Sequence, residues 1–141
     1  MKYVLDSSVA FKWVVPELHS DKALRLRSGF LASVHELLSP DVFPGEVGHA
    51  LTRAERQGRI TPGEALRLWA DVMTSSPQLI ASLPLMHRAI AISSQTRVGV
   101  FDCIYVVLAD REGCPFVTAD DRIVKNLQPL FPFIVPLSSL P

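Results

Sequence analysis

Short apolar runs alternate with longer segments of helical periodicity along this 141-residue chain. We expect strands over residues 2–5, 36–39, 78–83, 115–119 and 133–135. We expect helices over residues 8–15, 20–29, 44–58, 62–73, 85–95, 102–111 and from 120 or 121 to 127. Alternating strands and helices form parallel sheets, with the helices packed on both faces. The sequence therefore predicts an α/β fold, a three-layer α/β/α sandwich around a central, mainly parallel sheet.

Size and composition fit a single domain that spans residues 1–141. Hydrophobic residues make up 48% of the chain and charged residues 20%, which is typical of globular proteins. No apolar stretch approaches the roughly 18 residues that cross a bilayer, so we expect no membrane segment and a cytoplasmic protein. Cys103 and Cys114 lack the spacing of a zinc site or of a disulfide framework, so we expect buried free thiols.

The overall charge is only weakly informative about nucleic acids. Fourteen Lys and Arg residues balance fourteen Asp and Glu residues, so the basic excess typical of nucleic-acid-binding proteins is missing. A group of acids that binds metal would nevertheless leave a basic surface elsewhere on the molecule. The total therefore argues only mildly against RNA or DNA.

Four carboxylates stand where an apolar segment meets a turn or the start of a helix: Asp6, Glu46, Asp102 and Asp120. Asp6 and Asp120 follow expected strands, and ligands of α/β sheets bind at the carboxyl ends of strands. Each acid taken alone has an ordinary use as a cap or turn residue. Four acids at one edge would repel one another unless a cation compensates, and Mg²⁺ or Mn²⁺ binds both carboxylate and phosphate oxygens. The pattern predicts metal-dependent hydrolysis of phosphodiester bonds, with one or two metal ions.

Further polar residues accompany this group. His49, Arg53 and Arg56 follow Glu46 at spacings of three, four and three, which predicts one polar stripe along a helix. The arginines are candidates for binding RNA phosphates, and an ordinary solvated helix face is the alternative. Asp120 and its neighbour Asp121 could divide the roles of pocket ligand and helix cap in either order, and we favour Asp120 as the ligand.

The four acids lie in four recognisable segments: VLDSS from Val4, PGEVGHAL from Pro44, FDCIYVVLA from Phe101 and VTAD from Val117. In order and separation these segments resemble the motifs of the PIN-domain ribonucleases, specifically the VapC-type toxins of VapBC toxin-antitoxin pairs. The resemblance implies a PIN-like sheet between helices and a metal-dependent endoribonuclease. It also implies that these four acids are catalytic and bind Mg²⁺ or Mn²⁺.

The same resemblance assigns supporting residues and partners. Ser7, Ser8 and Thr118 would orient ligands or waters, while His49 and Cys103 depart from the family's usual Asn and Ala. His49 lies three residues after Glu46, where it would touch substrate, neighbour the metal or simply replace an amide. The expected partners are RNA, a small VapB-type antitoxin and a second copy of the chain in a homodimer.

Other readings of the sequence are weaker. A phosphatase with Asp6 as nucleophile would need a second Asp where Ser8 stands, and the GxxxxGK of a nucleotide-binding loop is missing. The remaining alternative is a catalytically inactive PIN-like interaction module, which the presence of all four acids disfavours. Trp13, Trp69, Val72 and Met73 fit either the core or a partner surface, and core packing is the commoner use of such residues.

Overall fold

The computed structural model describes residues 1–141 and contains one five-stranded sheet in which all neighbouring strands are parallel. The strands are β1 (Lys2–Leu5), β2 (Glu36–Pro40), β3 (Gln78–Ile80), β4 (Phe116–Thr118) and β5 (Ile134–Pro136). Their order across the sheet is β3-β2-β1-β4-β5, so β1 lies at the centre. The predicted α/β class is therefore confirmed, and the sheet is parallel throughout.

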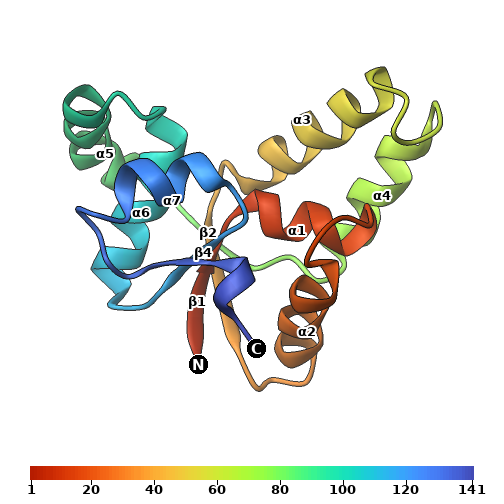
Figure 1. The fold of residues 1–141 in the computed structure, drawn as a ribbon, viewed down its shortest axis with the longest axis horizontal. Helices are drawn as coiled ribbons and strands as arrows, with labels where there is room; N and C mark the ends of the chain where they lie inside the picture. Colours follow the sequence, from red (N-terminus) through yellow and green to blue (C-terminus); the bar gives the residue numbers. More distant parts are fainter.

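Seven helices connect the strands. They are α1 (Ser7–Val14), α2 (Ser20–Leu31), α3 (Phe43–Arg56), α4 (Glu64–Met73), α5 (Leu83–Thr96), α6 (Val100–Glu112) and α7 (Asp121–Leu127), followed by the short 3-10 turn η1 (Leu137–Ser139). Figure 1 shows α1 to α4 on one side of the strands and α5 to α7 on the other. The layers are those of the predicted α/β/α sandwich.

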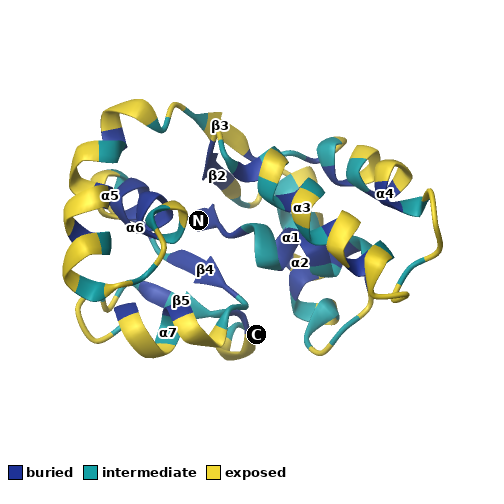
Figure 2. Cartoon of the chain, turned by 90° about the horizontal axis from the view of Figure 1, so that it is seen from above, coloured by how far each residue is buried: buried dark blue, intermediate teal, exposed yellow.

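Two apolar cores fill the space between these layers. Successive side chains of a strand point to opposite faces, so in β1 Tyr3 and Leu5 join the core under α1 to α4, while Val4 joins the core under α5 to α7. The central strands β1, β2 and β4 and the inner faces of the helices are mostly buried, while the edge strand β3 and the outer helix faces are largely exposed (Figure 2). Because both faces of the sheet are covered, its strands are apolar on both sides, as parallel sheets usually are.

The start of α4 differs from the prediction. Glu64 accepts hydrogen bonds from the backbone N–H of Thr61 at 3.0 Å and from its hydroxyl at 2.9 Å, so the expected side-chain pairing forms. Gly63, however, takes the left-handed conformation at φ +85°, which a continuing helix does not allow. The helix therefore begins at Glu64 instead of residue 62, and Glu55 from α3 accepts a bond from the N–H of Ala65 at 2.9 Å.

Strand β3 is shorter than predicted. It ends at Ile80 instead of residue 83, because α5 begins at Leu83. Cys103 and Cys114 are buried free thiols, as predicted. Trp13 and Val72 are buried, while Trp69 and Met73 are partly buried against the same core, so these four residues pack inward. No helix combines the length and apolar character needed to cross a bilayer.

Candidate active site

A cleft of about 1010 Å³ opens where β1 and β4 end, between α1 and α3 on one side and α6 and α7 on the other. Its lining includes all four predicted acids: Asp6, Glu46, Asp102 and Asp120. Asp6 follows β1 directly, and Asp120 follows β4 after one residue, so the parallel sheet delivers both to one edge. Glu46 and Asp102 lie in the first turns of α3 and α6, which begin near that edge.

Asp6 is the most buried of these acids, with 4% of its surface exposed. Its Oδ2 accepts hydrogen bonds from the hydroxyls of Ser8 at 2.6 Å and of Thr118 at 2.7 Å. Burial raises the pKa of Asp6, and the two hydroxyl donors oppose that rise because they favour the charged carboxylate. The position of this carboxylate is therefore fixed by one residue of α1 and one of β4.

The same hydroxyls bind the backbone that follows β4. The Ser8 oxygen accepts from the N–H of Ala119, and the Thr118 oxygen accepts from the N–H of Asp120, both at 3.0 Å. This network joins the end of β1 to the end of β4 through side chains 110 or more residues apart. The predicted supporting residues Ser8 and Thr118 thus contact Asp6 directly, although Thr118 lies buried beneath the cleft and does not line it; Ser7 lines it.

Glu46 is bound by a residue that the sequence did not single out. The hydroxyl of Tyr105 donates to Glu46 Oε1 at 2.7 Å. Burial raises the pKa of Glu46 to about 7, the negative charges of Asp6 and Asp102 add to this effect, and the Tyr105 hydrogen bond counteracts it. The ring of Tyr105 is fully buried and stacks on Phe116 at 5.4 Å between centroids.

One feature of the sequence could have identified Tyr105 as a candidate. It is the only hydroxyl-bearing residue in the apolar segment 102–111, and a buried hydroxyl requires a partner. It also follows Asp102 by three residues, which places the two side chains on neighbouring positions of one helix face. The sequence did not predict that the partner of this hydroxyl would be Glu46, 59 residues earlier in the chain.

Asp102 differs from the other acids in its surroundings. Burial is the main reason that the pKa of Asp102 is raised to about 6. The negative charges of Asp6 and Asp120 add to the rise, and the positive charge of Arg122 opposes it. No hydrogen bond contributes to this shift. Burial is the largest cause of the raised pKa of Asp6, Glu46 and Asp102, and the charge of Asp6 adds to the rise at both Glu46 and Asp102.

Asp120 and Asp121 do not divide their roles as expected. Asp120 lines the cleft and also caps α7, because its Oδ1 accepts from the N–H of Arg122 at 2.9 Å. Asp121 is exposed and does not line the cleft. A single carboxylate at the helix start, that of Asp120, is thus both the cap and the cleft residue, and a supporting role for Asp121 stays a prediction.

Only part of the predicted polar stripe of α3 faces the cleft. His49 and Arg53 line the cleft, but Arg56 does not, and Gln57 takes its place. At roughly 100° per residue, Arg53 is rotated about 20° from Glu46 around the helix axis and Arg56 about 80°. The position after Arg56 returns to within about 20° of Glu46, so Gln57 faces the cleft.

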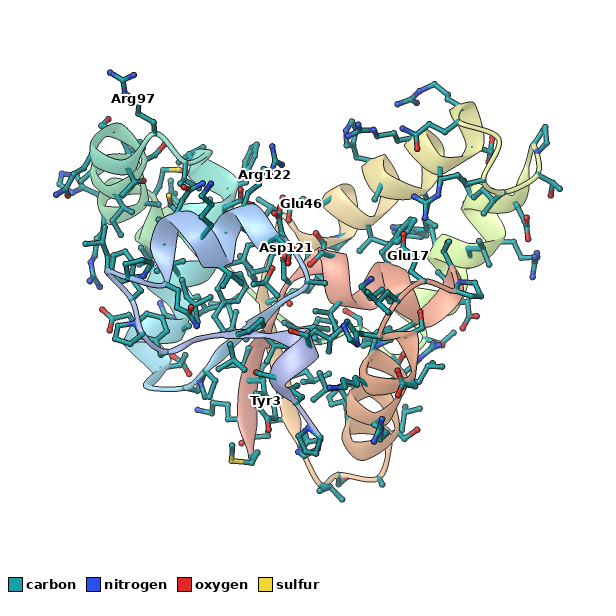
Figure 3. All side chains as sticks on the ribbon, in the orientation of Figure 1. Tyr3, Glu17, Glu46, Arg97, Asp121 and Arg122 are labelled. Carbon is teal, nitrogen blue, oxygen red and sulfur yellow. The ribbon has the colours of Figure 1, made fainter.

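The far end of the cleft contains an ion-pair group that sequence reasoning missed. Glu17 accepts from Lys12 Nζ at 3.2 Å and pairs with Arg59, and all three side chains line the cleft. Lys12 also donates to the carbonyl of Leu18 at 2.9 Å. In Figure 3, Glu46 and Arg122 lie near the end of the sheet, while Glu17 lies farther along the cleft. Nothing in the local sequence links residues 17 and 59.

The four acids form an open group. No three His, Cys, Asp or Glu side chains converge closely enough to form a metal cage by themselves. Mg²⁺ does not need such a cage, because it retains several waters and binds one or two protein carboxylates together with substrate phosphates. A half-buried Asp102 without hydrogen bonds, close to other carboxylates of raised pKa, fits a hard divalent cation.

Comparisons with known proteins identify the family to which this chain belongs. A curated relative, Ribonuclease VapC3 of Pyrobaculum aerophilum, is 26% identical over 132 residues, which cover 92% of this chain and 98% of the relative. The crystal structure of PAE2754 from Pyrobaculum aerophilum matches with a TM-score of 0.69 and 20% identity, over 99% of this chain and 94% of that chain. The VapBC2 structure from Rickettsia felis, bound to a DNA fragment from their promoter, matches with a TM-score of 0.61 and 14% identity, over 96% and 97% of the two chains. The PIN domain family itself matches residues 3–126, and the chain belongs to this family.

Proposed function

We propose that this protein is a metal-dependent endoribonuclease, the toxin of a VapBC-type pair, that cleaves RNA in the cytoplasm. The observation that carries this proposal is the meeting of Asp6, Glu46, Asp102 and Asp120 in one cleft of a PIN-domain chain. The name of the relative, a VapC ribonuclease, supports the same activity. All four carboxylates are present, which disfavours an inactive interaction module.

The four acids would hold Mg²⁺ or Mn²⁺. A divalent ion bound there supplies a water of lowered pKa and offsets the negative charge that develops on the phosphate. The carboxylate of Asp6, which two hydroxyls hold in place, would be one ligand. The carboxylate of Asp102, which accepts no hydrogen bond, would be another. Glu46 and Asp120 complete the group, each oriented by one donor, from Tyr105 and from the N–H of Arg122.

The remaining length of the cleft would bind the RNA backbone. Arg53 extends from α3 toward the cleft without an ion-pair partner, and His49 lies one turn closer to Glu46. Lys12 and Arg59 lie farther along, with part of their charge offset by Glu17. Arginine binds phosphate through two parallel N–H donors, so this wall would position the strand without reading its sequence.

A cognate VapB-type antitoxin would silence the enzyme. The solved structure of VapBC2, whose fold this chain shares, is that of such an assembled pair. A cleft lined by carboxylates also accepts an Arg or Lys side chain, and a charge-assisted contact near Glu46 and Asp102 would compete with metal and substrate. We also propose that the toxin is a homodimer, as the family resemblance implied.

The proposal is tested by removing single charges from the acids. Asp6→Asn, Asp102→Asn and Glu46→Gln should each abolish Mg²⁺- or Mn²⁺-dependent cleavage of single-stranded RNA, with a melting transition still present. A metal-stripped wild-type sample is the control. A folded variant that keeps near-native activity, with contaminating nuclease excluded, would remove that residue from the mechanism. A wild-type protein that binds its antitoxin but cleaves no RNA with either metal would favour the inactive module.

A further inference from the structure

Phe101 is an aromatic side chain exposed inside the cleft. It is the second residue of α6, directly before Asp102, and 52% of its surface is accessible to solvent. Single exposed apolar residues are common in proteins and need no explanation by themselves. Of the eleven large hydrophobic side chains that are exposed in this protein, however, Phe101 alone lines the cleft.

The packing of the other phenylalanines reinforces this distinction. The chain has seven phenylalanines, and six of them belong to the two apolar cores or pack against them: Phe11, Phe30, Phe43, Phe116, Phe131 and Phe133. Phe101 belongs to neither core. Its ring therefore contributes little to folding, and its place is set by the first turn of α6.

A cation accompanies the ring. Arg122 also lines the cleft, its side chain is 86% exposed, and its positive charge lowers the pKa of Asp102, the residue next to Phe101. Its guanidinium lies only 3.7 Å from Asp120 Oδ1, so it is held beside the acids by an exposed ion pair. One wall of the cleft thus offers an apolar ring and an exposed cation next to the proposed catalytic carboxylates.

We propose that Phe101 stacks on an unpaired base of the RNA, beside the phosphate that is cleaved, while Arg122 contacts the adjoining backbone. This inference rests on the proposed ribonuclease function and assigns to Phe101 the contact with a base of the single-stranded substrate. Proteins bind single strands by stacking bases on aromatic side chains next to basic groups, whereas a paired base has no free face to offer. The ring lies in the cleft that the substrate must enter, so RNA is favoured over a protein partner as its occupant.

The test compares Phe101→Leu with the parent protein in an Asp6→Asn background, so that RNA is bound without being cut. Leu keeps an apolar side chain and removes the aromatic face. The probes are fluorescent ten-nucleotide strands of adenosine and of uridine, and binding is measured by anisotropy. Ile90→Ala is the matched control, because Ile90 is also 52% exposed but lies on α5 outside the cleft.

The loss of stacking should weaken binding of the adenosine strand by about 5- to 100-fold. The uridine strand should lose less because its smaller base offers less area for stacking. Phe101→Trp should restore binding, and Ile90→Ala should leave it unchanged. In the active protein, Phe101→Leu should raise KM with the Mg²⁺-induced rise in melting temperature preserved, which a structural role for the ring would not produce.

Three outcomes would overturn the assignment. If the active protein cleaves RNA but Phe101→Leu binds both strands as tightly as the parent, the ribonuclease function stands and stacking is wrong. If RNA binding is unchanged while the variant escapes its antitoxin, Phe101 is a protein contact. If the wild type neither binds nor cleaves RNA, the proposed function fails and the stacking assignment fails with it.

Discussion

Tyr105 donates a hydrogen bond to Glu46 at 2.7 Å, and this bond joins α6 to α3 at the end of the sheet. The two helices cover opposite faces of the sheet, so the contact crosses from one helical layer to the other. The Tyr105 ring cannot easily move, since it is fully buried and stacked on Phe116. The hydroxyl therefore fixes one oxygen of Glu46 and favours its charged form.

Removing this hydroxyl should weaken metal binding. In Tyr105→Phe the pKa of Glu46 should rise further above its present value of about 7, because the donor that favours the carboxylate is lost. Mg²⁺ must then compete with a proton, so the half-saturating concentration should rise by about 3- to 10-fold near neutral pH. A titration of melting temperature against Mg²⁺ measures this change. Tyr3→Phe, at the other end of β1, is the control, and an equal metal response in both variants would contradict the assigned role.

The neighbours Asp120 and Asp121 should behave differently. Asp120→Asn keeps a good helix cap but removes a charge from the cleft, so it should reduce metal-dependent RNA cleavage by about 10-fold or more with little change in melting temperature. Asp121→Asn should leave cleavage near the wild-type level, because Asp121 lies outside the cleft. Cleavage rates at saturating Mg²⁺ measure the difference. Equal loss in the two variants would show that Asp121 contributes to the site after all.

The metal-free protein should lose stability as the pH rises. Asp6, Glu46 and Asp102 have raised pKa values, with Glu46 at about 7 and Asp102 at about 6, so between about pH 4.5 and 7 the folded state binds more protons than the unfolded state. The free energy of unfolding must then fall with increasing pH across this window. After allowance for solvent screening, we expect a loss on the order of 1 to 3 kcal/mol.

Chemical denaturation in a chelator at pH 5 and pH 7.5 measures this loss. Glu46→Gln should reduce the slope, because it removes the group with the pKa of about 7. Mg²⁺ should restore stability at pH 7.5 through binding to the native state alone. A metal-free protein that is equally stable at both pH values would mean that the cleft acids do not titrate as described.

The two arginines of α3 should contribute differently to RNA binding. Arg53→Gln removes a cation from the cleft, so it should lower the dependence of log affinity on log salt by about 0.7 for a single strand. Arg56→Gln removes the same charge from a position outside the cleft and serves as the matched control. Anisotropy titrations of a uridine decamer at several salt concentrations measure the two slopes. Matching slopes in the two variants would mean that Arg53 has no special contact with RNA.

The predicted class of fold needed only local signals. Each strand and helix is an apolar run or a periodic stripe of a few residues, ended by residues such as Pro16, Gly58 or Gly113. The boundary at α4 shows the limit of this reasoning. The hydrogen bonds between Thr61 and Glu64 could be predicted from the sequence. The left-handed backbone of Gly63, which decides where the helix begins, could not.

The sequence by itself determined the parallel α/β architecture, the membership of the PIN-domain family and the set of four acids that share one edge of the sheet. These depend on periodicity and on motif order, which a linear chain records. Only the tertiary structure decided which side chains complete the cleft. Tyr105 donates a hydrogen bond to Glu46, which lies 59 residues earlier in the chain, and Arg59 pairs with Glu17, which lies 42 residues earlier. Gln57, and not Arg56, lines the cleft. Such contacts depend on how the helical layers pack and rotate against the sheet, and no local preference of the chain encodes that geometry.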